Sequence, residues 1–75
     1  MKTLSESIRA LRRACGLTQG ALAERLNVTP QTISKWESGT TLPDVSMIVP
    51  LTSIFGVSAD VLFGISPDSQ EREIE

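Results

Sequence analysis

Histidine is absent from this sequence, and cysteine occurs once, as Cys15. Without histidine the chain can form neither a Ser-His relay nor a metal site that uses histidine, and one cysteine cannot build a cysteine-rich zinc cluster. Cys15 also lacks a partner for an internal disulfide, which fits a reducing cytoplasm. We therefore expect no metal ion and no other cofactor.

Long apolar runs are missing as well. No stretch approaches the length of a membrane span, and the first ten residues, MKTLSESIRA, lack the apolar segment of a signal peptide. The sequence also shows no nucleophile–base set, no paired carboxylates and no glycine loop that would cradle a phosphate. These absences predict a soluble, cytoplasmic protein that is not an enzyme.

The charges are unevenly distributed along the chain. Residues 66–75, SPDSQEREIE, hold four acids and one arginine, whereas residues 1–65 carry +1 within a total of −2. We therefore expect one domain at residues 1–65 and an acidic tail at residues 66–75. The tail is either a disordered end or the start of a further helix, with Ser66 as N-cap and Pro67 in its first position. The overall charge neither requires nor excludes a polyanion as partner.

Three helices are predicted in the first half of the chain. Thr18 is expected to cap the second helix, which ends at Asn27 because asparagine tolerates a left-handed backbone. Thr29 caps the third, Pro30 occupies its first position, and Gly39 ends it. The first helix has a stripe of apolar residues at intervals of four, three and four: Leu4, Ile8, Leu11 and Cys15. Because Cys15 belongs to this stripe, we expect its thiol to be buried and inert.

Two more helices are predicted in the second half. Pro43 and Asp44 start a fourth helix, and Ser58 caps a short fifth one that ends at Gly64. Pro50 falls inside the fourth helix, where we expect a kink or a tightened first turn with the proline facing solvent. No run of β-branched and aromatic residues alternates with polar ones, so the fold class is all-α, a compact five-helix bundle. The apolar side of the fourth helix comprises Val45, Ile48, Leu51 and Phe55.

The second and third predicted helices meet the steric demands of a helix-turn-helix. Ala23 is small enough for the point where the helices cross, and Asn27 can adopt the left-handed turn. Val28, Ile33 and Trp36 follow with the spacing of an inward-facing side. Each feature alone is weak, but their combined spacing strongly indicates this motif.

These residues carry a resemblance to a known family. LTQGALAERLNVTPQTISKWESG, followed by LPD and IFGVSADVL, resembles the Cro/phage-repressor type of helix-turn-helix DNA-binding domain, the XRE-like family. The resemblance covers about residues 4–63. It implies a lambda-repressor-like fold with the helix-turn-helix at helices 2 and 3, and a bacterial or phage regulator of transcription that binds double-stranded DNA.

The resemblance also implies roles for single residues. It places Pro30, Gln31, Thr32 and Lys35 at the bases of the major groove, where Gln31 can bond adenine and Lys35 guanine or a phosphate. Arg12 and Glu37 match positions that form a salt bridge between the first and third helices. The candidates for phosphate contacts are Thr18, Gln19, Thr29, Ser34, Ser38 and Thr40.

Several alternatives stay open. Polar residues on the third helix could be a solvated face, and for Arg9 and Arg13 a solvated face and long-range attraction to DNA are equally good interpretations. A five-helix core does not need every apolar residue near the C-terminal end, so a homodimer contact competes with core packing for Val57, Val61, Phe63 and Ile65.

The main functional prediction is a sequence-specific, dimeric repressor that binds an inverted repeat. One alternative is a DNA-binding antitoxin whose C-terminal region binds a toxin. Another is an adaptor that keeps the fold and binds proteins without reading DNA, which the low positive charge of residues 1–65 favours slightly.

Overall fold

Short polar caps define where the helices begin. In a computed structural model, which describes residues 3–64, the Thr3 hydroxyl accepts the Glu6 N–H while the Glu6 carboxylate accepts the Thr3 N–H. Thr18, Thr29 and Ser58 each accept an N–H three residues later. The elements are α1 Leu4–Ala14, α2 Gln19–Leu26, α3 Pro30–Ser38, the 3₁₀ turn η1 Val45–Met47, α4 Ile48–Phe55 and α5 Ala59–Leu62.

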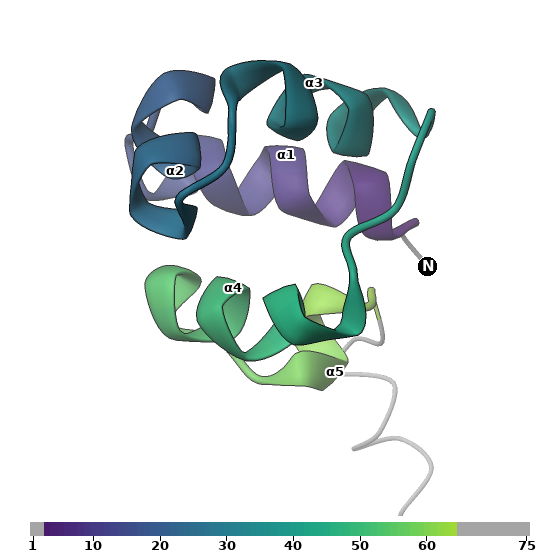
Figure 1. The fold of residues 1–75 in the computed structure, drawn as a ribbon. Coiled ribbons are helices and arrows are strands. Elements are labelled where there is room, and N and C mark those ends of the chain that lie inside the picture. Colours follow the sequence, from purple (N-terminus) through teal and green to yellow (C-terminus); the bar gives the residue numbers. More distant parts are fainter. Residues whose placement is uncertain (1–2, 65–75) are drawn as a thin grey trace, which may run out of the picture.

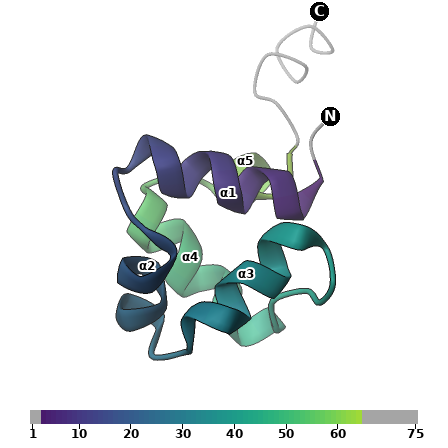
Figure 2. The same ribbon diagram turned by 90° about the horizontal axis from the view of Figure 1, so that it is seen from above.

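The helices form two groups around one core. Helices α1, α2 and α3 pack together on one side of the molecule, while α4 and α5 lie together on the other (Figure 1). Seen from above, α1 and α3 lie alongside each other with α2 at one end of the pair (Figure 2). All regular elements within residues 3–64 are helical, as predicted from the sequence. Among these helices, none combines the length and the apolar character needed to cross a membrane.

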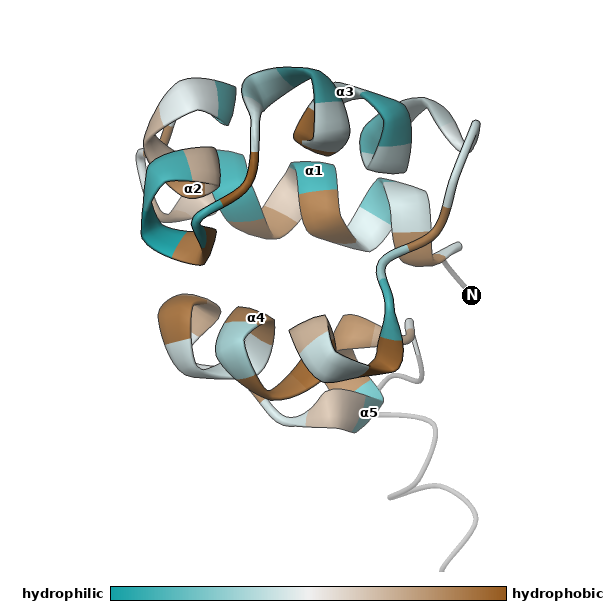
Figure 3. Cartoon of the chain, in the orientation of Figure 1, coloured by the Kyte–Doolittle hydropathy of each residue, from teal (hydrophilic) through white to brown (hydrophobic). Residues whose placement is uncertain are grey.

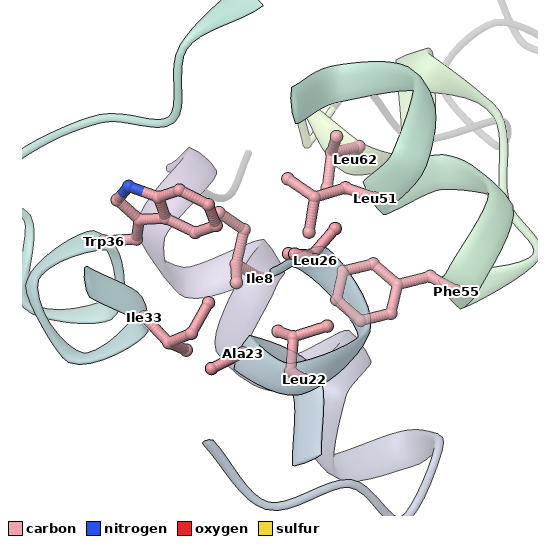
Figure 4. Close-up of a cluster of buried hydrophobic side chains, with 9 residues drawn as sticks. All are labelled: Ile8, Leu22, Ala23, Leu26, Ile33, Trp36, Leu51, Phe55 and Leu62. Carbon is pink, nitrogen blue, oxygen red and sulfur yellow. The ribbon is translucent and has the colours of Figure 1, made fainter. Parts of the chain in front are cut away.

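The core lies where these two groups of helices meet. Its side chains come from all five α-helices and interdigitate in the interior (Figure 4). Helix α3 contributes Ile33, with 0% of its surface exposed, and Trp36, with 4%. Because both point inward, α3 is anchored along one side and its opposite side is left for solvent. The buried hydrophobic residues are Ile8, Leu22, Ala23, Leu26, Ile33, Trp36, Leu51, Phe55 and Leu62.

The prediction of a buried Cys15 is wrong. Helix α1 ends at Ala14, and Cys15 is its C-cap with an exposed thiol. Gly16 follows with φ of 72°, which turns the chain away from the helix axis. Cys15 itself keeps a right-handed helical backbone, and its N–H donates to the Leu11 carbonyl at 3.0 Å, so it stays in phase with the stripe, but the core does not extend to this end of α1.

The predicted start of the fourth helix is also wrong. Asp44 caps the 3₁₀ turn η1, and the α-helix begins only at Ile48. Val45 belongs to this turn, ahead of the α-helix, and is 85% exposed. Pro50 is consequently the third residue of α4. The predicted tightening of the first turn is confirmed, but Pro50 is half-buried rather than fully exposed.

Candidate nucleic-acid interface

The turn between α2 and α3 fixes how these two helices cross. Ala23 is buried at their contact, and its carbonyl accepts the Val28 N–H at 2.9 Å. Asn27 adopts the left-handed conformation, with φ of 62° and ψ of 42°. Its backbone N–H donates to the Glu24 carbonyl at 3.3 Å, which closes the end of α2. The chain thus leaves α2 and enters α3 after only three residues.

Helix α3 presents a polar strip on the side opposite Ile33 and Trp36. Gln31 and Lys35 are both exposed and lie one turn apart on the same face, about 6 Å along the helix axis. Pro30 is exposed beside them at the first turn. The outer surface of α3 is accordingly among the hydrophilic parts of the molecule (Figure 3). The structure therefore brings three of the four predicted base-contacting residues to one open surface.

The fourth residue, Thr32, is half-buried and belongs to the cap of α3. The Thr29 hydroxyl oxygen accepts the Thr32 N–H at 3.2 Å and lies 2.9 Å from the Thr32 hydroxyl oxygen. A similar contact starts α2, where the Thr18 hydroxyl oxygen accepts the Ala21 N–H at 2.9 Å. Because the Thr18 hydroxyl accepts this bond, its own hydrogen remains available to donate outward.

A second pair of hydroxyl groups lies at the other end of α3. The Ser38 hydroxyl donates to the Lys35 carbonyl at 3.1 Å, and its oxygen lies 2.8 Å from the Thr40 hydroxyl oxygen. Both residues are exposed. Ser34 is exposed one turn before Ser38, and its hydroxyl makes no hydrogen bond within residues 3–64. The predicted phosphate contacts on α3 therefore surround its polar strip.

An ion pair braces α3 from beneath. The Arg12 guanidinium donates through Nε to Glu37 Oε2 at 2.6 Å and through Nη2 to Glu37 Oε1 at 3.2 Å. Its third group, Nη1, donates to the Leu17 carbonyl at 2.7 Å. Gln19 Nε2 donates to Glu37 Oε1 at 3.0 Å. The salt bridge implied by the resemblance is thus present, and Gln19 extends it, so that one carboxylate on α3 joins side chains from α1 and α2.

The surroundings of Glu37 keep its carboxylate ionised. Burial alone would raise its pKa, but hydrogen bonds from Arg12 and Gln19 and the charges of Arg12 and Arg9 lower it below the usual glutamate value. The side chains of Arg12 and Glu37 are only 11% and 5% exposed. Water therefore screens this pair weakly, which makes it a rigid support for α3.

The predicted dimer contacts are only partly accessible. Val57 and Val61 are half-buried, Val57 packs against the core, and Phe63 is 42% exposed. Ile65 lies outside the described residues, as does the predicted tail. The structure also shows three exposed apolar side chains that were not predicted from the sequence: Leu42, Val45 and Val49. Val45 had been assigned to the buried side of the fourth helix because it fits the helical spacing.

Comparison with known proteins shows which family has this arrangement of helices. A sequence model described as helix-turn-helix matches residues 8–62. The chain belongs to the helix-turn-helix family. This family comprises DNA-binding regulators rather than enzymes, and the crossing of α2 and α3 described above forms its characteristic motif.

Individual relatives are regulators from bacteria and phages. The HTH-type transcriptional activator BcrR of Enterococcus faecalis is 40% identical over 58 residues, which span 77% of this chain and 28% of BcrR. The 26 kDa repressor protein of Escherichia phage HK022 is 42% identical over 50 residues, spanning 67% of this chain and 21% of that repressor. The chain therefore spans less than a third of these two relatives.

A solved structure shows the same fold. It contains the P22 c2 repressor in complex with a synthetic operator, and it matches this chain with a TM-score of 0.79 and 29% sequence identity. The match covers 88% of this chain and all of that repressor chain. The fold of residues 3–64 is therefore that of a phage-repressor DNA-binding domain.

Proposed function

We propose that this protein is a sequence-specific regulator of transcription that reads double-stranded DNA with α3. The polar strip of α3, opposite a fully buried anchor, is the observation that carries this proposal. An α-helix fits the major groove of B-DNA, which is about 12 Å wide. The similarity to a repressor whose structure contains an operator supports the same assignment.

Base recognition would come from the first two turns of α3. The Gln31 amide can donate to adenine N7 and accept from adenine N6, a bidentate contact. Lys35 can donate to guanine O6 and N7 or to a phosphate. Pro30 offers an apolar surface to a thymine methyl group, and Thr32 can add a hydrogen bond to a neighbouring base or phosphate. Specificity in this account depends mainly on Gln31 and Lys35.

The contacts to the DNA backbone would fix the angle of α3 in the groove. Gln19 lies at the N-terminus of α2, where free N–H groups and the helix dipole favour a phosphate. Its amide already holds Glu37, so a phosphate bound there would be positioned relative to α3. The remaining backbone contacts in this proposal are Thr18, Thr29, Ser34, Ser38 and Thr40.

The proposal includes a homodimer on an inverted repeat. One copy has few cations to neutralise phosphates, so it should bind DNA with modest affinity. Two copies bound at half-sites about 34–36 Å apart would bind more tightly. Phe63 is the most exposed of the predicted contacts, and replacing it with serine should weaken dimer formation, as measured by sedimentation equilibrium. Within this proposal the protein acts in the cytoplasm as a repressor, and a reporter gene placed behind the selected site would show the sign of regulation.

Selection from random duplexes tests the proposal. The wild-type chain should enrich an inverted repeat, and Gln31→Ala should blur the preference at one position in each half-site, at a cost of about 1–3 kcal/mol of discrimination. Glu24→Ala, an exposed change on α2 outside the interface, should leave the enriched site unchanged. If the wild-type chain enriches no sequence even at low salt, DNA reading is wrong and a protein partner becomes the better explanation for the polar strip.

A further inference from the structure

Two arginines on α1 have no partner in the fold. Arg9 and Arg13 are both exposed and lie one turn apart on α1, so their charges repel each other. Neither makes a hydrogen bond or an ion pair within residues 3–64. The nearby Glu6 carboxylate, three residues before Arg9, instead accepts the Thr3 N–H. Arg9 is attracted at longer range by the Glu37 carboxylate, but no ion pair within residues 3–64 offsets the repulsion between the two arginines.

Both arginines line a polar pocket between α1 and α3. Its volume is about 220 Å³, several times the roughly 30 Å³ that one water molecule occupies, so a hydrated anion fits. Arg9 acts on the carboxylate of Glu37 inside this pocket, because its charge contributes to the lowered pKa of Glu37. The pocket is lined by Arg9, Arg12, Arg13, Gln19, Ser34, Glu37 and Ser38.

The pocket concentrates positive charge that the rest of the fold lacks. Residues 3–64 contain five arginines and lysines and five acids, so their net charge is zero. Three of the five cations line this pocket against one acid, Glu37, which leaves +2 there. Glu37 is already paired with Arg12, so Arg9 and Arg13 supply the uncompensated charge. Hydroxyl groups of Ser34 and Ser38 lie on the opposite wall, on α3.

Stabilisation of the end of α1 explains only part of this arrangement. A cation in the last turn of a helix interacts favourably with the helix dipole, and Arg13 lies there, as Arg25 does in α2. Arg9 lies one turn earlier, beyond the reach of that effect. The dipole therefore does not explain why Arg9 faces the same pocket as Arg13.

We infer that Arg9 and Arg13 bind a backbone phosphate of DNA in this pocket, with the hydroxyl of Ser34 as an additional donor. The inference rests on the proposed function, because the pocket borders the polar strip that would enter the groove. It makes α1 a third element of the interface, beside α2 and α3. Phosphate contacts position a protein without reading sequence, so these arginines would set affinity and its salt dependence, and the enriched site would stay the same.

The salt dependence of binding tests this inference. The affinity of the wild-type chain for its enriched duplex would be measured by fluorescence anisotropy over a series of KCl concentrations. The same series would be run for Arg9→Gln, Arg13→Gln and the double variant. Arg25→Gln is the matched control, because Arg25 is exposed, lies in the last turn of its helix and loses the same charge outside the pocket. Because the two arginines share one phosphate, the double variant should reduce the slope of log K against log salt by about 0.9, and each single variant should reduce it by part of that amount.

The expected result is a shallower slope for each pocket variant, with little change for Arg25→Gln and the same enriched sequence throughout. Equal slopes for Arg13→Gln and Arg25→Gln would overturn the inference while leaving the proposed function intact. Failure of the wild-type chain to bind any duplex would overturn both. A separate experiment titrates inorganic phosphate into the protein and follows the amide NMR signals of Ser34 and Ser38. If these signals shift while the pocket variants keep the salt slope of the wild-type chain on DNA, the pocket binds a free anion and the assignment to DNA is wrong.

Discussion

Replacing Glu37 with glutamine should destabilise the fold far more than the small change in shape suggests. The carboxylate accepts two hydrogen bonds from Arg12 and one from Gln19, and its side chain is almost fully buried. Glutamine keeps one acceptor oxygen but presents an N–H₂ group to the remaining donors and carries no charge. The guanidinium of Arg12 would then remain buried without a counterion.

The magnitude follows from this loss of pairing. Removing one partner of a buried ion pair costs about 3–5 kcal/mol, because the remaining charge stays desolvated. Arg12 keeps its bond to the Leu17 carbonyl, and glutamine retains one acceptor, so we expect the lower end, about 3 kcal/mol. For a domain of this size, that corresponds to a fall of roughly 12–24 °C in the melting temperature.

Urea and thermal unfolding, followed by circular dichroism, would measure this effect. Glu24→Gln is the matched control, because Glu24 is exposed and makes no side-chain hydrogen bond or ion pair within residues 3–64. It should change the free energy of unfolding by less than about 0.5 kcal/mol. A loss below about 1 kcal/mol in Glu37→Gln would refute the reasoning, since surface pairs have that value.

Three further predictions concern stability. Gly20→Ala should raise the free energy of unfolding by about 0.5–1 kcal/mol in urea titration, because an added Cβ would meet only the Thr18 hydroxyl at 3.9 Å; a loss would show that the space is misjudged. Pro50→Ala should change the free energy of unfolding by less than about 1 kcal/mol, because an N–H in the first turn of α4 has no acceptor within that helix. A gain near 3 kcal/mol would instead indicate that Pro50 acts as an interior proline. The pKa of Glu37 is lower in the folded chain than its ordinary value of 4.5, so its contribution to the free energy of unfolding is complete above pH 4.5 and is lost as pH falls through the folded pKa. Glu37→Gln should therefore lose less stability in acid than the wild-type chain. Parallel curves of stability against pH for the two proteins would contradict this.

Local chemistry made much of the fold predictable from the sequence. The caps Thr18 and Thr29, and the left-handed turn at Asn27, depend on neighbouring residues, so their signals are present in short stretches. The inward side of α3 was equally clear, because Ile33 and Trp36 have helical spacing.

Periodicity failed at the ends of two helices. Cys15 follows the stripe of α1 and keeps a helical hydrogen bond to the Leu11 carbonyl, but it is the C-cap and lies beyond the core. Val45 follows the stripe of α4, but it belongs to the 3₁₀ turn before that helix and is exposed. A pattern predicts which residues share a face, but it does not predict how far along that face the core extends.

The site was predictable only in part. The pairing of Arg12 with Glu37 came from family resemblance, whereas the contact of Arg12 with the Leu17 carbonyl depends on how the chain leaves α1. The pocket beside it joins residues from three helices, and no local pattern brings Arg9 next to Ser34. The base-contact roles of Gln31 and Lys35 stay predictions.

The central claim is that the exposed side of α3 reads DNA. The most direct test is a two-dimensional NMR titration of the ¹⁵N-labelled chain with its enriched duplex, or with random duplex at low salt if nothing is enriched. We predict that the largest shifts occur at Gln31, Thr32 and Lys35, while the backbone signals of α4, on the other side of the core, change little. Shifts concentrated at Val45, Val49 and Phe63 with α3 unchanged would contradict the account.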